Sequence, residues 1–152
     1  MLPRSLFLLP RLYLSIIFLV AVSAKLTSTG GFAPRMIGFL NATALQSAAP
    51  WYQAFVRTVV LTHASLFAGL VIAGELVVGI TLLVGLATRA GAAVAIVLLF
   101  NYFSAKGLPP WSPASNDIAD IVLCILVVMS AAGRYFGIDQ ILAQRFPRAV
   151  IW

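Results

Sequence analysis

Four polar residues stand inside otherwise apolar stretches of this sequence, and together they could carry out proton or anion chemistry. Lys25 supplies an ammonium group, Glu75 and Asp120 supply carboxyl groups, and Asn101 supplies an amide. Carboxyl groups can take up and release protons, and an ammonium group can stabilise an anion. A charge near the centre of a membrane costs about 2.5 to 3.5 kcal/mol, so such residues are candidate functional sites. The alternative is structural, because the same side chains could lock helices together.

The spacing of these four residues indicates a common depth in a membrane. Each lies 12 or 14 residues along its helix from an arginine at the end of an apolar stretch. These arginines are Arg11, Arg89 and Arg134. If the arginines are level, the helical rise puts the four residues within about 3 Å of one depth. That depth is about two-thirds of the way across a ~30 Å hydrocarbon core. We therefore expect one polar cluster inside a helix bundle.

Glu75 is expected to face protein rather than lipid. Ala64, Ala68, Glu75 and Gly79 fall within about 60° of one another around a helix. Small residues on this face would let a neighbouring helix approach closely.

The composition indicates an integral membrane protein. The chain has 152 residues, of which 62% are hydrophobic and 9% are charged, and its mean hydropathy is +1.04. Soluble domains carry about 25% charged residues. The charged residues of this chain are therefore too few to form a water-facing surface. At this length we expect a single transmembrane domain over residues 1–152.

The apolar stretches predict an all-α, four-helix membrane bundle. The expected spans cover about residues 8–26, 59–86, 90–105 and 118–133. Each must be helical, because lipid offers no hydrogen-bond partner to the backbone. The long first loop between spans one and two contains a predicted short helix over 36–48. Its tryptophan and other aromatic residues suit the outer headgroup boundary.

Four spans put both termini on one side of the membrane, and the cations indicate which side. Six arginines fall on the side of the termini and four cations on the other, which favours termini in the cytoplasm of a bacterial inner membrane. The six are Arg4, Arg11, Arg89, Arg134, Arg145 and Arg148; the four are Lys25, Arg35, Arg57 and Lys106.

The first span also has features of a cleavable secretory signal. We favour retention, because cleavage would remove one wall of the bundle.

Several kinds of site are excluded by residue counts. Cys124 and His63 are the only cysteine and histidine, so the chain can form no internal disulfide, zinc or iron–sulfur Cys/His cluster, or bis-histidine haem. No intrinsic cofactor or metal is therefore expected, and Cys124 is interpreted as a small buried apolar residue. The Lys and Arg residues are scattered singly, which argues against nucleic-acid binding.

Three stretches resemble the DoxX family of small bacterial membrane proteins, which includes DoxD-like members. They are "RLYLSIIFLVAVSAKL", "GELVVGITLLVGLATRAGA" and "SNDIADIVLCILVVMSAAGRYFGID". The matching features are a lysine closing span one, Gly-Glu and Gly-x-x-Thr-Arg in span two, and a Gly-Arg-x-x-Gly-x-Asp exit from span four. The resemblance implies a four-helix membrane protein. The family name comes from a subunit associated with thiosulfate:quinone oxidoreductase, and relatives are linked to membrane redox assemblies.

The favoured function is therefore an accessory subunit of a quinone- or sulfur-linked membrane redox assembly. Such a subunit would contact the lipid bilayer and other membrane or redox subunits. Because the chain carries no electron-transferring group, it is not expected to be a complete enzyme alone, and a quinone is the possible cofactor. Two alternatives remain: a structural or assembly subunit, and a binder or carrier of a small molecule. The spans show no clear inverted repeat, which argues against a transporter.

Overall fold

The computed structural model describes residues 4–134 and 137–146. Arg148, which counted toward the predicted orientation, lies outside them. In these two segments all regular structure is helical, as predicted. The longer helices are α1 (Leu8–Leu26), α5 (Ala64–Val84), α6 (Thr88–Lys106) and α7 (Asp117–Ser130). The shorter helices are α2 (Phe32–Ala42), α3 (Ala44–Ser47), α4 (Pro50–Phe55) and α8 (Ile138–Arg145).

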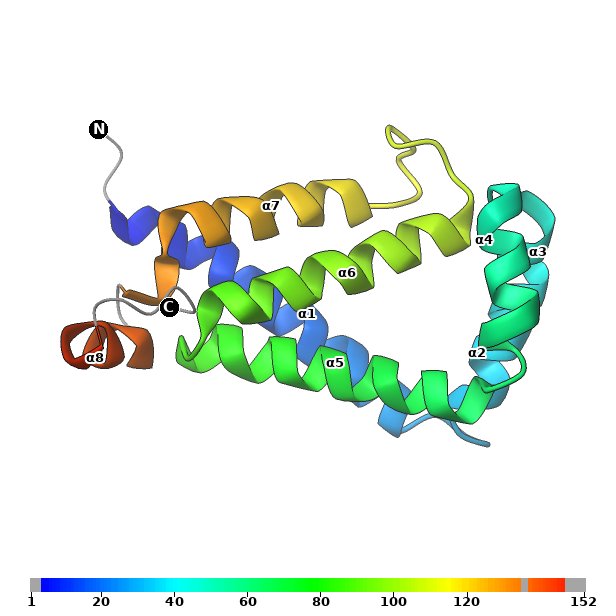
Figure 1. The fold of residues 1–152 in the computed structure, drawn as a ribbon, viewed down its shortest axis with the longest axis horizontal. Coiled ribbons are helices and arrows are strands. Elements are labelled where there is room, and N and C mark those ends of the chain that lie inside the picture. Colours follow the sequence, from blue (N-terminus) through cyan, green and yellow to red (C-terminus); the bar gives the residue numbers. More distant parts are fainter. Residues whose placement is uncertain (1–3, 135–136, 147–152) are drawn as a thin grey trace.

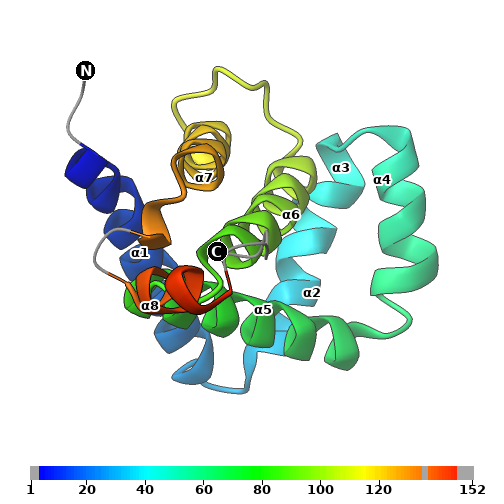
Figure 2. The same ribbon diagram turned by 60° about the vertical axis from the view of Figure 1, so that its left-hand side comes forward.

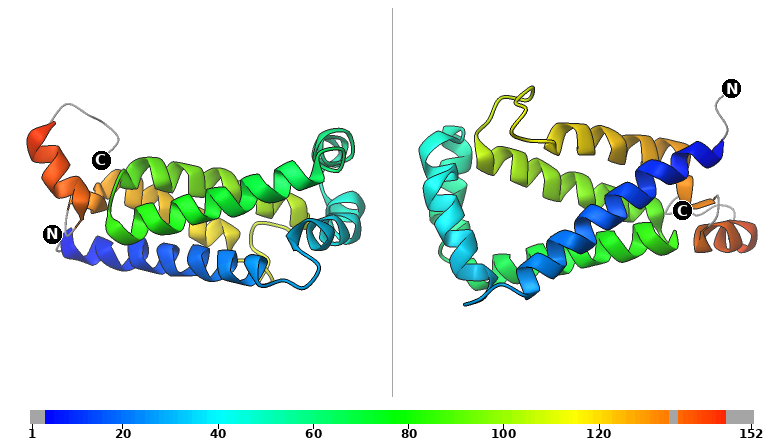
Figure 3. Two further views of the ribbon diagram at one scale, coloured as in Figure 1. Left: turned by 90° about the horizontal axis from the view of Figure 1, so that it is seen from below. Right: turned by 180° about the vertical axis from the view of Figure 1, so that it is seen from behind.

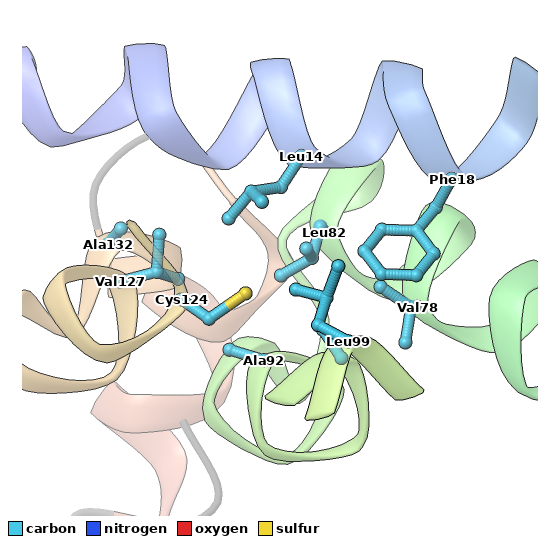
Figure 4. Packing of buried hydrophobic residues seen from close by; sticks show 10 residues of the cluster. Leu14, Phe18, Val78, Leu82, Ala92, Leu99, Cys124, Val127 and Ala132 are labelled. Carbon is cyan, nitrogen blue, oxygen red and sulfur yellow. The ribbon is translucent and has the colours of Figure 1, made fainter. Parts of the chain in front are cut away.

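The four longer helices pack around one apolar core. Helix α1 runs diagonally across α5 and α7, and α6 packs between α5 and α7 (Figure 1, Figure 3). The core contains side chains from all four helices, including Leu14, Val78, Leu99 and the predicted buried Cys124 (Figure 4). The outward faces remain apolar, with exposed residues such as Ile16, Leu66 and Val97. These outward faces suit acyl chains rather than water.

In the described part of the chain, three helices are long and apolar enough to cross a membrane: α1, α5 and α6. Their bounds agree with the predicted spans except at the start of the second, which was placed at residue 59. There the chain forms a π-helical turn over Val56–Val60, and α5 begins only at Ala64. Helix α7 is shorter than predicted. It has 14 residues, or roughly 21 Å, and ends where Ala131 adopts a left-handed conformation with φ of 49°.

The segment between α1 and α5 is mostly helical and covers one end of the longer helices (Figure 2). The predicted helix over 36–48 corresponds to most of α2 together with α3. A second apolar cluster joins α2, α3 and α4 to α5 and α6 through residues including Leu40, Tyr52, Ala68 and Ala105. Burial raises the pKa of the Tyr52 phenol, so its hydroxyl remains a donor at neutral pH and bonds to the backbone oxygen of Asn101 at 3.1 Å. We call α2–α4 the helical cap.

At the opposite end of the longer helices, the turn between α5 and α6 packs closely against the start of α8. Asp139 is fully buried, and its carboxylate accepts the backbone N–H groups of Ala87 at 2.6 Å and Thr88 at 2.9 Å. Its own N–H donates to the Gly85 oxygen at 2.8 Å. Gly85 has φ of +67°, and a Cβ there would lie 2.7 Å from the Cα of Gly137. The Gly-x-x-Thr-Arg and Gly-Arg-x-x-Gly-x-Asp motifs therefore meet, and Asp139 caps the N-terminus of α6.

Candidate functional site

Glu75 lies at the centre of a buried polar cluster formed by three helices. Its oxygen Oε1 accepts a hydrogen bond from Lys25 Nζ of α1 at 2.7 Å and another from the Tyr102 hydroxyl of α6 at 2.6 Å. Glu75 is 1% exposed and Lys25 is 18% exposed. Two short bonds to a charged acceptor are strong in surroundings without water. We call Lys25, Glu75 and Tyr102 the Glu75 cluster.

Small residues of α5 let this cluster form. Of the four residues on the predicted face, Ala68, Glu75 and Gly79 are buried and Ala64 is half-buried. A Cβ at Gly79 would lie 2.6 Å from a methyl carbon of Leu19 in α1, so the two helices approach as closely as glycine allows. The hydroxyl of Ser15 donates to the Gly79 backbone oxygen at 2.8 Å, which fixes the register of α1 on α5.

The second carboxylate oxygen of Glu75 has a different environment. Oε2 is buried, and no described residue forms a hydrogen bond to it. A buried carboxylate oxygen can accept a further donor or carry a proton. The Glu75 cluster can therefore accept a further hydrogen bond, or hold a proton, at the buried oxygen Oε2.

A cavity of about 720 Å³ adjoins the cluster. Lys25 and Tyr102 line it, whereas Glu75, to which both are bonded, is not part of the lining. Most of its walls are aromatic or aliphatic, and they come from α1, α5, α6 and the helical cap. The aromatic lining residues are Phe32, Phe39, Tyr52, Phe55, Phe67 and Tyr102. Lys25 Nζ lies 5.2 Å from the ring centre of Phe32 and 5.8 Å from that of Tyr102, which are favourable cation–π distances.

Asn101 lines the same cavity, but its side chain forms a hydrogen bond within α6 rather than to Glu75. Its side-chain Nδ2 donates to the backbone oxygen of Val97, one turn earlier in α6, at 2.8 Å. Asn101 therefore lies near Lys25 and Tyr102 without replacing either partner of the carboxylate.

Asp120 occupies a separate polar site on α7. Its carboxyl group interacts electrostatically with the Tyr13 side chain of α1 and with Asp117 and Lys106. Lys106 forms a salt bridge to Asp117, with Nζ and Oδ2 2.8 Å apart. The structure thus brings Lys25 and Glu75 together, leaves Asn101 beside them, and places Asp120 in a different group.

Sequence reasoning missed two parts of this site. Tyr102 was not selected, although it is a hydroxyl-bearing residue next to Asn101 in an apolar span. The aromatic residues of the first loop were assigned to a belt at the headgroup boundary in preference to a ligand-binding cage. In residues 4–134 and 137–146, no group of three or more His, Cys, Asp or Glu side chains is arranged to hold a metal ion.

Comparison with known proteins gives one match. The family model described as "TQO small subunit DoxD" matches residues 6–151, which is nearly the whole chain. Searches of curated proteins and of solved structures find no significant match. Since the family match spans all the helices that form the Glu75 cluster and its cavity, the chain belongs to the DoxD family.

Proposed function

We propose that this chain is the small membrane subunit of a thiosulfate:quinone oxidoreductase complex and that its cavity holds a quinone ring. The observation that carries the proposal is the pairing of an aromatic cavity with two hydrogen-bond donors, Lys25 and Tyr102, that share a buried carboxylate. The family description supports membership of such a complex. In this account the chain supplies the quinone site, and partner subunits supply the rest of the enzyme.

The cavity suits a quinone in size and in chemistry. Sites for cofactor-sized ligands have volumes of about 300–1,000 Å³ and mainly apolar walls with a few placed polar groups. Aromatic side chains such as Phe32 and Tyr102 can pack against a flat ring. A quinone presents two carbonyl oxygens, which can accept hydrogen bonds from donors placed in the cavity.

The residues of the cluster have distinct roles in this proposal. Reduction of one quinone consumes two electrons and two protons, and the oxidation of two thiosulfate ions to tetrathionate releases two electrons. Lys25 donates one of its remaining N–H groups to a quinone oxygen and stabilises negative charge that develops on it, whereas the single O–H of Tyr102 stays on Glu75 and its ring forms part of the cavity wall. Glu75 holds both donors in place through Oε1, and its unbonded Oε2 is where a proton is held before transfer.

The proposal extends to architecture and location. Helix α7 forms the fourth wall of a membrane-embedded bundle, with the short turn at Ala132–Arg134 lengthening it toward the headgroups. The protein lies in the bacterial inner membrane with its termini in the cytoplasm. The electrostatic interaction between Tyr13 of α1 and Asp120 of α7 has a structural role. Lys25, Glu75 and Asn101 belong to the quinone site.

The test is to purify the chain with its partner subunits in mild detergent. Retained quinone would be quantified by mass spectrometry, and thiosulfate-dependent reduction of decylubiquinone by absorbance. We expect retained quinone in the wild type and a loss of both readouts in Glu75→Gln. Asp120→Asn is the matched control, because it neutralises an acid outside the cavity and should keep the bound quinone. Equal quinone retention in both variants would contradict the proposal.

A structural role for the cluster is the second candidate. It is favoured by the position of Glu75 at the junction of α1, α5 and α6, where its bonds join three helices. It predicts that partner subunits co-purify without any quinone and that Glu75→Gln changes only stability.

A further inference from the structure

The exposed residues that line the cavity are Ala24, Arg35, Phe39, Leu70 and Val97, and all of them except Arg35 are apolar. Of these, Phe39 of α2, Leu70 of α5 and Val97 of α6 are exposed by 44%, 55% and 61% respectively. By contrast, lining residues of the helical cap such as Leu40 and Tyr52 are buried. We call Phe39, Leu70 and Val97 the mouth of the cavity.

The mouth lies between two helices that diverge. Helices α5 and α6 are joined by the short turn near Gly85 and separate toward the helical cap (Figure 1). Side chains of both helices line the cavity along this separation. The mouth therefore faces sideways, across the bundle axis, rather than along it.

The depth of the mouth separates it from the charged ends of the helices. Val97 lies nine residues before Lys106, the last residue of α6, which places it about 13 Å deeper along that helix. Leu70 lies six residues into α5 from Ala64, or about 9 Å. Three cations line the cavity, and none of them belongs to the mouth: Lys25 lies beside Tyr102, and Arg35 and Lys106 lie near the start of α2 and the end of α6.

We infer that the cavity is loaded sideways from the acyl-chain region, through the mouth between α5 and α6. This inference rests on the proposed quinone site and specifies how the ligand enters it. The ring passes Leu70 and Val97 and stops against Lys25 and Tyr102, and the isoprenoid tail stays between Phe39, Leu70 and Val97 and extends into lipid. A water-soluble solute would have to cross acyl chains to reach the mouth, so the ligand class is a lipid-soluble molecule with a polar ring.

The experiment uses variants in which a larger side chain narrows the mouth, which we call plugs, reconstituted in nanodiscs. The probe is a photoreactive ubiquinone analogue that carries a ring azide and a short isoprenoid tail. Leu70→Trp and Val97→Trp narrow the mouth. Leu66→Trp and Val94→Trp are matched controls on the same helices, at lipid-exposed positions outside the cavity lining. We expect each plug to lower the labelling yield at least about tenfold, and each control to stay within about twofold of the wild type.

The outcomes separate the entry route from the proposed function. If the wild type is not labelled at all, the quinone site itself is wrong. If the wild type is labelled and the plugs are labelled as strongly as their controls, the site stands and the sideways route is overturned. Leu70→Ala and Val97→Ala guard against a folding defect in the tryptophan variants, because they widen the mouth. They should label at least as fast as the wild type, and slower labelling would also overturn the inference.

Discussion

Glu75 is tolerated inside an apolar helix because both of its donors come from neighbouring helices. Lys25 and Tyr102 converge on the same oxygen, so most of the cost of burying the carboxylate is offset by two strong bonds. The two partners of the ion pair are not equally buried. Lys25 has a long flexible stem and is partly exposed, whereas Glu75 is almost completely enclosed.

This asymmetry predicts that replacing Glu75 and replacing Lys25 lower the free energy of unfolding by unequal amounts. Glu75→Gln should lower the free energy of unfolding by about 1–3 kcal/mol, because Lys25 loses its counter-charge but can reach toward the headgroups. Lys25→Met should cost more, since it leaves the carboxylate enclosed with Tyr102 as its one remaining donor. The double variant Lys25→Met/Glu75→Gln should recover most of the loss. Unfolding in mixed detergent micelles measures all three, and equal losses in the two single variants would contradict the account.

Tyr102 tests the hydrogen bond without changing the shape of the site. Tyr102→Phe keeps the aromatic ring in the cavity wall but removes the donor to Glu75. We expect a loss of about 0.5–1.5 kcal/mol in stability together with weaker quinone retention. Tyr52→Phe is the matched control, because the Tyr52 hydroxyl bonds to the Asn101 backbone and not to Glu75. Equal quinone loss in both variants would argue against a special role for Tyr102.

At the scale of elements, the length of the apolar stretches predicted where the long helices lie and the bounds of α1, but not the start of α5 or the end of α7. The left-handed residues Gly85 and Ala131 end α5 and α7, and a π-helical turn delays the start of α5. Such local backbone choices depend on tertiary contacts, as at Gly85, which packs against Gly137. A hydropathy window cannot detect them.

Asp139 is expected to stabilise the α5–α6 turn from a distance in sequence. Asp139→Ala removes both bonds that cap α6 and should lower the free energy of unfolding by about 1–2 kcal/mol. It also removes a negative charge that interacts with the guanidinium of Arg11. Gln140→Ala, at the next and exposed position, is the matched control and should have little effect. Thermal unfolding in detergent measures both, and similar melting temperatures for the two variants would refute the capping role.

Two glycines of α5 predict opposite responses to alanine. A Cβ at Gly79 collides with Leu19 of α1, whereas a Cβ at Gly69 meets no atom within 4 Å. Gly79→Ala should therefore cost about 1–3 kcal/mol by overpacking. Gly69→Ala should be neutral or stabilising, because alanine favours the helix. The same unfolding titration reports both, and a neutral Gly79→Ala would show that α1 and α5 are not in close contact.

At the scale of the whole molecule, the site lies between two packed regions. One is the core of the four longer helices, and the other joins the helical cap to α5 and α6. The cavity occupies the space where they meet. Counting residues along each helix predicted a common depth for Lys25, Glu75, Asn101 and Asp120, but depth is only one coordinate. The identity of the neighbouring helices and the rotation of each helix decide that Glu75 bonds to Lys25, whereas Asp120 lies in another polar group, with electrostatic interactions to Tyr13, Asp117 and Lys106.

The most direct measurement is to map the residues that a photoreactive quinone labels in the wild-type complex. The account predicts adducts concentrated on the end of α1 near Lys25, on α2 near Phe32, and on α6 near Tyr102, with strong reduction in Glu75→Gln. Adducts spread over the lipid-facing residues of α1 and α7, and unchanged in Glu75→Gln, would contradict it.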